Sequence, residues 1–297
     1  MRIAISGSSG MVGRALATAL LADGHDVVPL VRDNADGIHW TPATGEFDQE
    51  KMGDVDVLVH LAGENIAQGR WTKAKKERIR SSRTDATRLL CESLAKMKSG
   101  PRTMISASAI GIYGDRGDEV LDEDAAPGEG FLPDVCRNWE SATQVVVDAG
   151  MRVVNLRLGM VLSRAGGALK PMLLPFKLGL GGRMGSGRQY WSWITLTDAV
   201  RVIQFTIDTP TLSGPVNAVT PVAVTNLEFT KALGKAIRRP TIFPMPGPAA
   251  RMVLGQMADG LILASARVVP RKLEEAGFKF SHSQLDDALQ HVLANKP

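Results

Sequence analysis

A glycine-rich turn near the start of the chain constrains the fold more than any other feature. In "IAISGSSGMVG", Gly7, Gly10 and Gly13 separate a short apolar run at residues 2–6 from an amphipathic helical segment. Glycine lets the backbone turn tightly and approach a ligand, while the free amides and the dipole at a helix start favour negative charge. In this context the spacing predicts a turn that binds the diphosphate of a dinucleotide. The expected contacts are Gly7, Ser8, Ser9, Gly10, Met11 and Val12.

Strand-like and helical segments alternate along the first half of the chain. Short β-branched runs are followed by longer segments of helical period, which is typical of βαβ units on a parallel sheet. We therefore predict an α/β protein with an NAD(P)-binding, Rossmann-like doubly wound parallel sheet and a smaller C-terminal substrate domain. The expected strands cover residues 2–6, 26–31, 37–40, 55–61, 102–107 and 152–157.

The sequence changes character after Arg157. Residues 162–189, "LSRAGGALKPMLLPFKLGLGGRMGSGRQ", are rich in glycine and proline and show no strong period. We expect a dinucleotide-binding domain at 1–163 and a substrate-side domain at 164–297, with elements at about 194–220 returning to the first. In the second domain, Thr225 and Glu228 have the spacing of a capping box at a helix start.

Composition limits the compartment and the membrane interactions. The chain has 297 residues, 44% of them hydrophobic, with a mean hydropathy of −0.02, as in globular proteins. No secretory pattern precedes the first strand, so we expect a cytoplasmic protein. The apolar stretch Met252 to Leu263 is interrupted by Asp259, which argues against a membrane span. We interpret this stretch as part of the core or as an interface helix. A homodimer is one assembly that such an interface would allow.

Cysteine spacing and charge exclude two further classes of site. Cys91 and Cys136 are the only cysteines and fit neither a metal-ligand nor a CxxC spacing, so no metal site is expected. The formal charge is +4, and the excess is local, because residues 70–83 contain seven basic residues and one acid. A solvated helix face explains this run. Nucleic-acid binding would need further basic stripes with interleaved aromatic residues, and we expect no such partner.

The second strand should end beside the adenosine ribose of the cofactor. An acid there accepts from the 2′-hydroxyl, whereas an arginine suits a 2′-phosphate. The strand expected at residues 26–31 is followed by Arg32 and then by Asp33. If the strand ends at Val31, Arg32 occupies the deciding position, and we therefore predict NADP(H) as the cofactor.

Several motifs together resemble a known superfamily. "VDVLVHLAG" at 55–63, "SASAIGIYG" at 106–114 and "WSWITLTDAV" at 191–200 join the glycine spacing. They resemble the extended short-chain dehydrogenase/reductases. "HLAGENIAQGRW", "FLPDVCRNWE" and "RVVPRKLEEAGFKF" are similar to an atypical, epimerase-like family related to the nucleoside-diphosphate-sugar epimerases. The resemblance covers nearly the whole chain.

The resemblance implies further site residues at the ends of two strands. Ser108 matches the catalytic Ser/Thr of the superfamily, and Tyr113 matches the tyrosine of its "VYG" loop. We therefore name both as candidate catalytic residues. The implied cofactor contacts, beyond the fourth strand and beneath the nicotinamide ribose, are Leu61, Ala62, Gly63, Ser106 and Ala107.

The usual proton-transfer pair of the superfamily is missing from this chain. That pair is a second tyrosine followed four residues later by a lysine, which lowers the pKa of the phenol. The only tyrosines here are Tyr113 and Tyr190, and Gly117 and Ile194 stand four residues after them. Without a nearby lysine, hydrogen bonding or packing is the simpler role for Tyr113.

Arg83 stands where the superfamily usually has an asparagine. Ile79, Ala86 and Leu90 lie four, three and seven residues away, so a helix aims Arg83 along its apolar face. A buried unpaired charge is costly, which predicts a partner. Either an anionic group of the cofactor or substrate, or an internal acid such as Glu64, would serve, and we include Arg83 among the cofactor-binding candidates.

Two functions follow from these features. The first is an NADP(H)-binding, epimerase-like oxidoreductase acting on an unidentified small molecule, with Ser108 and Tyr113 polarising the substrate oxygen. The alternative is a catalytically weak NADP(H)-binding sensor or regulatory protein, which the missing Tyr/Lys pair favours.

Overall fold

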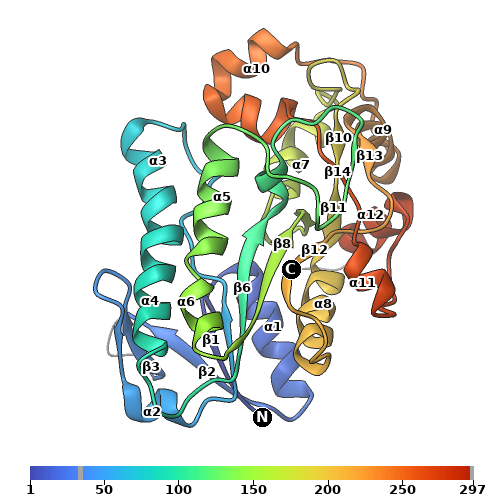
Figure 1. Cartoon of the computed structure of the whole chain (residues 1–297). Helices are drawn as coiled ribbons and strands as arrows, with labels where there is room; N and C mark the ends of the chain where they lie inside the picture. Colours follow the sequence, from blue (N-terminus) through green and yellow to red (C-terminus); the bar gives the residue numbers. More distant parts are fainter. Residues whose placement is uncertain (33–35, 295–297) are drawn as a thin grey trace.

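The computed structural model describes residues 1–32 and 36–294, so Asp33 lies outside the described residues. An eight-stranded sheet in the order β12-β8-β6-β5-β1-β2-β3-β4 organises the lower half of the molecule (Figure 1). Its strands pair in parallel except β3 with β4. This confirms the predicted fold class. The strands are β1 (Arg2–Ser6), β2 (Asp26–Val31), β3 (Ile38–Thr41), β4 (Glu46–Phe47), β5 (Val57–His60), β6 (Thr103–Ala109), β8 (Arg152–Leu158) and β12 (Gly214–Ala218).

Helices cover both faces of this sheet because successive strand residues point to opposite sides. Ile3 and Ile5 are buried under α1 and α8, whereas Ala4 between them packs with α4 and α6. Burial of each large aliphatic side chain contributes about 1.5–3 kcal/mol. The covering helices are α1 (Met11–Ala22), α8 (Leu196–Asp208), α2 (Gln49–Gly53), α3 (Lys73–Arg80), η1 (Ser81–Asp85), α4 (Ala86–Leu94), α5 (Phe131–Ser141) and α6 (Gln144–Asp148).

Smaller elements lie in the upper and right-hand part of Figure 1, and some of them pack on the core of the large sheet or in small apolar clusters. The others surround a separate core. Trp191, Trp193 and Phe229 are among its buried members. Thr225 and Glu228 form the predicted capping box at the start of α9. The elements are η2 (Ile110–Tyr113), β7 (Val120–Leu121), β9 (Met160–Leu162), α7 (Leu169–Lys177), β10 (Tyr190–Trp191), β11 (Trp193–Thr195), β13 (Val224–Thr225), α9 (Asn226–Ile237), α10 (Gly247–Leu254), η3 (Ala258–Leu263), β14 (Arg267–Val268), α11 (Arg271–Glu275) and α12 (Leu285–Ala294).

The chain crosses between the two parts more than once. Residues 196–218 supply α8 and β12, and these elements pack on α1 and pair with β8. The segment after residue 163 therefore leaves the large sheet and later returns to it. The division into domains at 163 stays a prediction.

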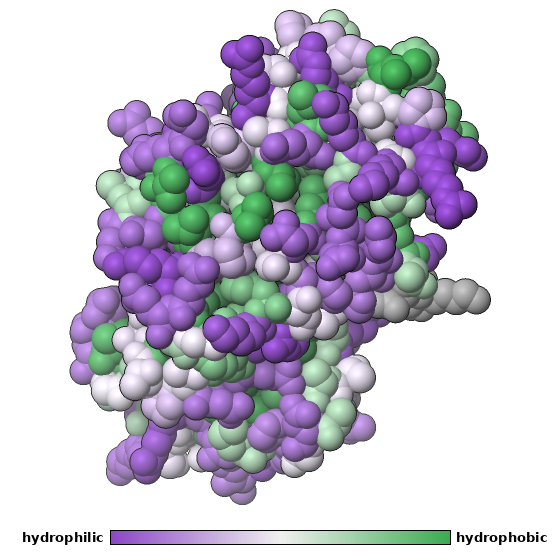
Figure 2. Space-filling model, turned by 90° about the vertical axis from the view of Figure 1, so that its right-hand side faces the viewer, coloured by the Kyte–Doolittle hydropathy of each residue, from purple (hydrophilic) through white to green (hydrophobic). Residues whose placement is uncertain are grey.

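Apolar side chains are exposed in the C-terminal part. Met252 is 78% exposed and Val253 56%, so the core interpretation of this stretch is wrong for these two residues, although it holds for Met257 and Ala258. Figure 2 shows one face, on which green hydrophobic areas in the upper half are separated by purple side chains. Across residues 1–32 and 36–294, no helix is both long enough and apolar enough to cross a membrane.

Candidate functional site

The glycine turn lies directly against the segment that follows β5. Gly7 has a φ of 70°, and a Cβ there would lie 2.9 Å from the backbone nitrogen of Ala62. A Cβ on Gly13 would lie 2.3 Å from the carbonyl oxygen of Gly7. Contacts this short exclude any side chain. Close packing thus holds together two segments that the sequence predicts to line the cofactor.

The start of α1 is suited to an anion. Gly10 is the N-cap and has no side chain to satisfy the first amides of the helix. The first turn, residues 11–14, contains no acid. Ser9 and Gly10 are exposed, and Ser8, Met11 and Val12 are half-buried. These residues fit the diphosphate of a dinucleotide, which would accept from the amides and be stabilised by the helix dipole.

A buried hydrogen-bond network of Ser6, His60 and Thr87 joins the strand before the turn to the segment that follows β5. Ser6 Oγ lies 2.7 Å from His60 Nδ1 and accepts from the backbone nitrogens of Leu61 and Ala62 at 3.1 and 3.2 Å. His60 Nε2 lies 3.0 Å from Thr87 Oγ1. His60 is therefore a buried core histidine whose two ring nitrogens both have partners. The roles of Ser6 and Thr87 were missed, because nothing local in the sequence joins residues so far apart.

Burial of His60 predicts an acid-sensitive fold. Burial lowers the pKa of its imidazole from 6.5 to about 4. Below pH 6.5 the His60 imidazole binds a proton in the unfolded chain but stays neutral in the folded chain. The stability that this group contributes above pH 6.5 is therefore lost as the pH falls towards 4. The expected loss is about 3 kcal/mol. Urea unfolding of the wild type and of His60→Gln between pH 4 and 8 measures it. The variant should lose this part of the pH slope, whereas His39→Gln, at an exposed histidine, should keep it.

Arg32 directly follows β2 and is exposed. The strand ends at Val31, as the choice of NADP(H) assumed. Its guanidinium is therefore accessible at the carboxyl end of the sheet, on the far side of β1 from β5. Asp33, the competing candidate, lies outside the described residues.

The end of β6 carries the remaining predicted contacts. Ser106 is fully buried, and Ala107 and Ser108 are 6% and 3% exposed. Leu61 and Ala62 are half-buried, and Gly63 is exposed. Since β5 and β6 are neighbours, their carboxyl ends lie at the same edge of the sheet. Contact of these residues with the cofactor stays a prediction.

Ser108 is held by a buried ion pair. Its hydroxyl donates to Glu140 Oε1 at 2.6 Å. Arg157 holds the same carboxylate at both oxygens, with Nε–Oε1 and Nη2–Oε2 distances of 2.9 Å. Side chains of Arg157 and Glu140 are 7% and 13% exposed. A bidentate bond of this kind fixes the carboxylate in orientation.

Tyr113 belongs to the same network and is fully buried. Its hydroxyl lies 2.8 Å from Arg157 Nη1 and 2.7 Å from Asn217 Oδ1, and donates to the Asp122 carbonyl at 2.9 Å. Burial raises the pKa of the phenol, against the opposing effect of Arg157. These contacts describe the packing and hydrogen-bonding role that the sequence favoured for Tyr113. They do not bring its hydroxyl to an open surface of the site.

Glu64 and two cations form a second cluster at the end of β5. Lys75 Nζ lies 2.6 Å from Glu64 Oε1, and Arg78 Nε lies 3.5 Å from the same oxygen. The hydrogen bond from Lys75 is the main cause of a lowered pKa at Glu64. The Lys75 side chain is 6% exposed, so the solvated-face interpretation of the basic run is wrong at this position.

Neither cysteine has the features of a reactive or metal-binding thiol. Cys91 and Cys136 are free and buried. Burial, with Glu140 nearby, raises the pKa of Cys136 to about 12, so it stays protonated at neutral pH. Within the described part of the chain, no group of three or more His, Cys, Asp or Glu side chains could hold a metal ion.

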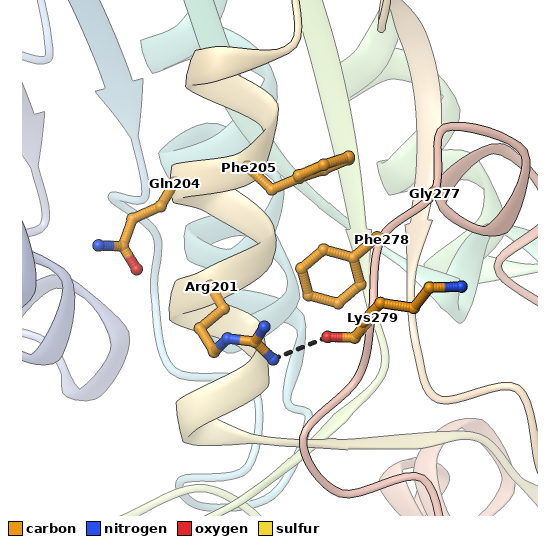
Figure 3. A pocket seen from close by; sticks show the side chains of 6 residues that line it. All are labelled: Arg201, Gln204, Phe205, Gly277, Phe278 and Lys279. Atoms are coloured by element: carbon orange, nitrogen blue, oxygen red, sulfur yellow. Dashed lines mark hydrogen bonds between the residues drawn. The ribbon is translucent and has the colours of Figure 1, made fainter.

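A recess of about 420 Å³ lies on another part of the molecule (Figure 3). Arg201 and Phe205 of α8 face Phe278 there, and Arg201 donates to the Lys279 carbonyl at 2.8 Å. The neighbouring Gln204 bonds Asp23, which follows the last residue of α1. The recess therefore lies toward the opposite end of α1 from the glycine turn. With Arg201 already paired, we assign it no part in the cofactor site.

Comparisons with known proteins identify the family of the chain. Residues 3–219 match the NAD dependent epimerase/dehydratase family, and residues 245–292 match a domain of unknown function, DUF1731. The chain is 48% identical to the epimerase family protein Mb2239 of Mycobacterium bovis, over 98% of this chain and 97% of that protein.

Solved structures extend the likeness to three dimensions. The crystal structure of the human epimerase family protein SDR39U1 (isoform 2) with NADPH has a TM-score of 0.90 and 30% identity, covering 100% of both chains. A nucleoside-diphosphate sugar epimerase from Corynebacterium glutamicum has a TM-score of 0.83 and 38% identity, covering 99% of this chain and 58% of that one. The chain therefore belongs to the NAD-dependent epimerase/dehydratase family, among the SDR39U1-like epimerase family proteins that carry a C-terminal DUF1731 domain.

Proposed function

We propose that this protein binds NADP(H) at the glycine turn and uses it on a small-molecule substrate. The observation that carries the proposal is the start of α1. Its first amides have no side-chain cap, its first turn contains no acid, and Gly7 and Gly13 beside it tolerate no side chain. The full-length likeness to a human protein crystallised with NADPH supports the choice of cofactor. In this proposal Arg32 holds the 2′-phosphate, and Leu61, Ala62, Gly63, Ser106 and Ala107 line the nicotinamide half.

Ser108 is the candidate for contact with substrate. NADP(H) supplies hydride transfer when it is bound. Because the proton of Ser108 is directed at Glu140, its oxygen presents lone pairs and suits a donor such as a substrate hydroxyl. Arg157 and Glu140 then act as positioning residues that fix this orientation. The reaction class we favour is oxidoreduction at an alcohol or carbonyl carbon, without the usual Tyr/Lys pair.

The sensor function remains the second candidate. It is favoured by the burial of Tyr113 and by exposed apolar side chains such as Met252 and Val253. Incubation with NADP⁺ and NADPH against a broad panel of alcohols and carbonyl compounds separates the two. Turnover that falls at least tenfold in Ser108→Ala supports the enzyme, whereas tight NADPH binding with no turnover on any compound supports the sensor.

The cofactor assignment makes a prediction about Arg32. Arg32→Ala should weaken NADPH binding about tenfold to a hundredfold, because charge-assisted hydrogen bonds to a phosphate contribute about 1.5–3 kcal/mol. Binding of NADH, which lacks the phosphate, should change less than twofold. Fluorescence titration measures both, with Arg88→Ala on α4 as an exposed-arginine control. Equal affinity of the wild type for NADPH and NADH would overturn the assignment.

A further inference from the structure

Among the basic side chains of residues 70–83, those of Lys75 and Arg83 are both at least partly buried, and of these two only Lys75 forms an ion pair with an acid in the described part of the chain. Lys75 and Arg83 belong to the continuous helical segment formed by α3 and η1. Lys75 is paired with Glu64 at 2.6 Å. Glu64 forms a second ion pair, with Arg78. The carboxylate that could have served Arg83 is therefore already held by two other side chains.

Arg83 forms no ion pair with any carboxylate in residues 1–32 and 36–294. Within this part of the chain its only hydrogen bond is a long one of 3.4 Å, from Nη1 to the Ile79 carbonyl. Its Cζ lies 5.1 Å from the ring of Trp139. Burial lowers the pKa of the guanidinium, against the opposing effects of Cys136 and Glu64. An aromatic face attracts a cation, but it leaves most of the five N–H donors without an acceptor.

The position of Arg83 connects it to the proposed site. A Cβ added to Gly63 would lie 3.2 Å from Arg83 Cζ, so the guanidinium lies close to the backbone of the segment that follows β5. Trp139, whose ring the guanidinium approaches, directly precedes Glu140, which accepts from Ser108. The guanidinium thus lies among the segments proposed to line the nicotinamide half. Arg83 as a whole is half-buried.

We propose that Arg83 binds a phosphate or carboxylate group at this end of the site. The inference rests on the proposed function for its placement beside the cofactor. The anion has two sources, the diphosphate of NADP(H) or a charged group of the substrate, and both present oxygens to the same donors. Arginine is suited to either, since its planar fork binds such groups through two bonds.

Two variants test the proposal. Arg83→Met keeps the apolar stem and removes the charge, and Arg80→Met is the matched control, since Arg80 is 50% exposed on the same segment. Circular dichroism and thermal melts establish that both fold. Titration with NADPH measures the cofactor arm. Calorimetric titration of inorganic phosphate into NADPH-saturated protein measures the substrate arm.

Each result decides the question. If the anion is the cofactor's, Arg83→Met weakens NADPH binding about tenfold or more while Arg80→Met stays within twofold. If it is the substrate's, NADPH binding is unchanged and the saturated wild type binds phosphate at least tenfold more tightly than Arg83→Met. Equal behaviour of Arg83→Met and wild type in both arms would overturn the proposal. A wild type that fails to bind NADPH contradicts the proposed function, yet phosphate binding to the free protein that is lost in Arg83→Met would still support the anion site.

Discussion

Replacing Gly13 with alanine is expected to raise the dissociation constant of NADPH by about a hundredfold or more. The new Cβ would lie 2.3 Å from the Gly7 carbonyl oxygen and 2.8 Å from Ser8 Cα. Both atoms are backbone, so the turn itself has to move, and the amides that would bind the diphosphate move with it. Such overpacking also lowers the free energy of unfolding by about 1–3 kcal/mol.

Gly53→Ala is the matched control. Its Cβ would meet only the Ser99 hydroxyl, at 3.2 Å, and that side chain can rotate away. We expect NADPH binding to change less than twofold in this variant. Titration and urea unfolding on both proteins separate lost binding from lost stability. If Gly13→Ala bound NADPH within twofold of wild type, the turn would not be the diphosphate site.

Glu140→Leu is expected to have the largest effect on stability. It leaves the Arg157 guanidinium buried without its carboxylate, and breaking a buried pair from one side costs about 3–5 kcal/mol. The double variant Glu140→Leu/Arg157→Leu removes both charges and should recover much of the loss. Urea unfolding at pH 7 measures the free energy of unfolding of each protein.

Asp134→Ala, on the same helix, is the surface control. Asp134 and Arg137 form an ion pair whose side chains are 58% and 51% exposed, and such pairs contribute about 0–1 kcal/mol. If Glu140→Leu also lowered the free energy of unfolding by less than about 1 kcal/mol, Arg157 would have to bind other partners in the variant. The network would then not be the rigid support proposed for Ser108.

Sequence reasoning performed best where structure is local. The glycine turn, the end of β2 at Val31 and the capping box at Thr225 depend on residues a few positions apart, and all three appear as predicted. The alternation of apolar runs with helical segments also predicted the parallel sheet, because strands that are buried on both faces are continuously apolar.

The support of the candidate site could not be predicted in this way. Tyr113 meets Asn217 across 104 positions, and Ser108 meets Glu140 across 32. No local pattern marks such partners, because the fold alone brings them together. The same holds for the buried Lys75, whose partner Glu64 lies in the segment that follows β5. Sequence did identify the missing Tyr/Lys pair, since counting two tyrosines suffices.

A crystal structure of the protein with NADPH tests the central claim most directly. The account predicts the diphosphate within hydrogen-bond distance of the backbone amides at the start of α1, with the 2′-phosphate against Arg32. It also predicts the nicotinamide beyond the carboxyl ends of β5 and β6, on the side of Ser108. A cofactor bound elsewhere, or a diphosphate that makes no contact with residues 8–12, would contradict it.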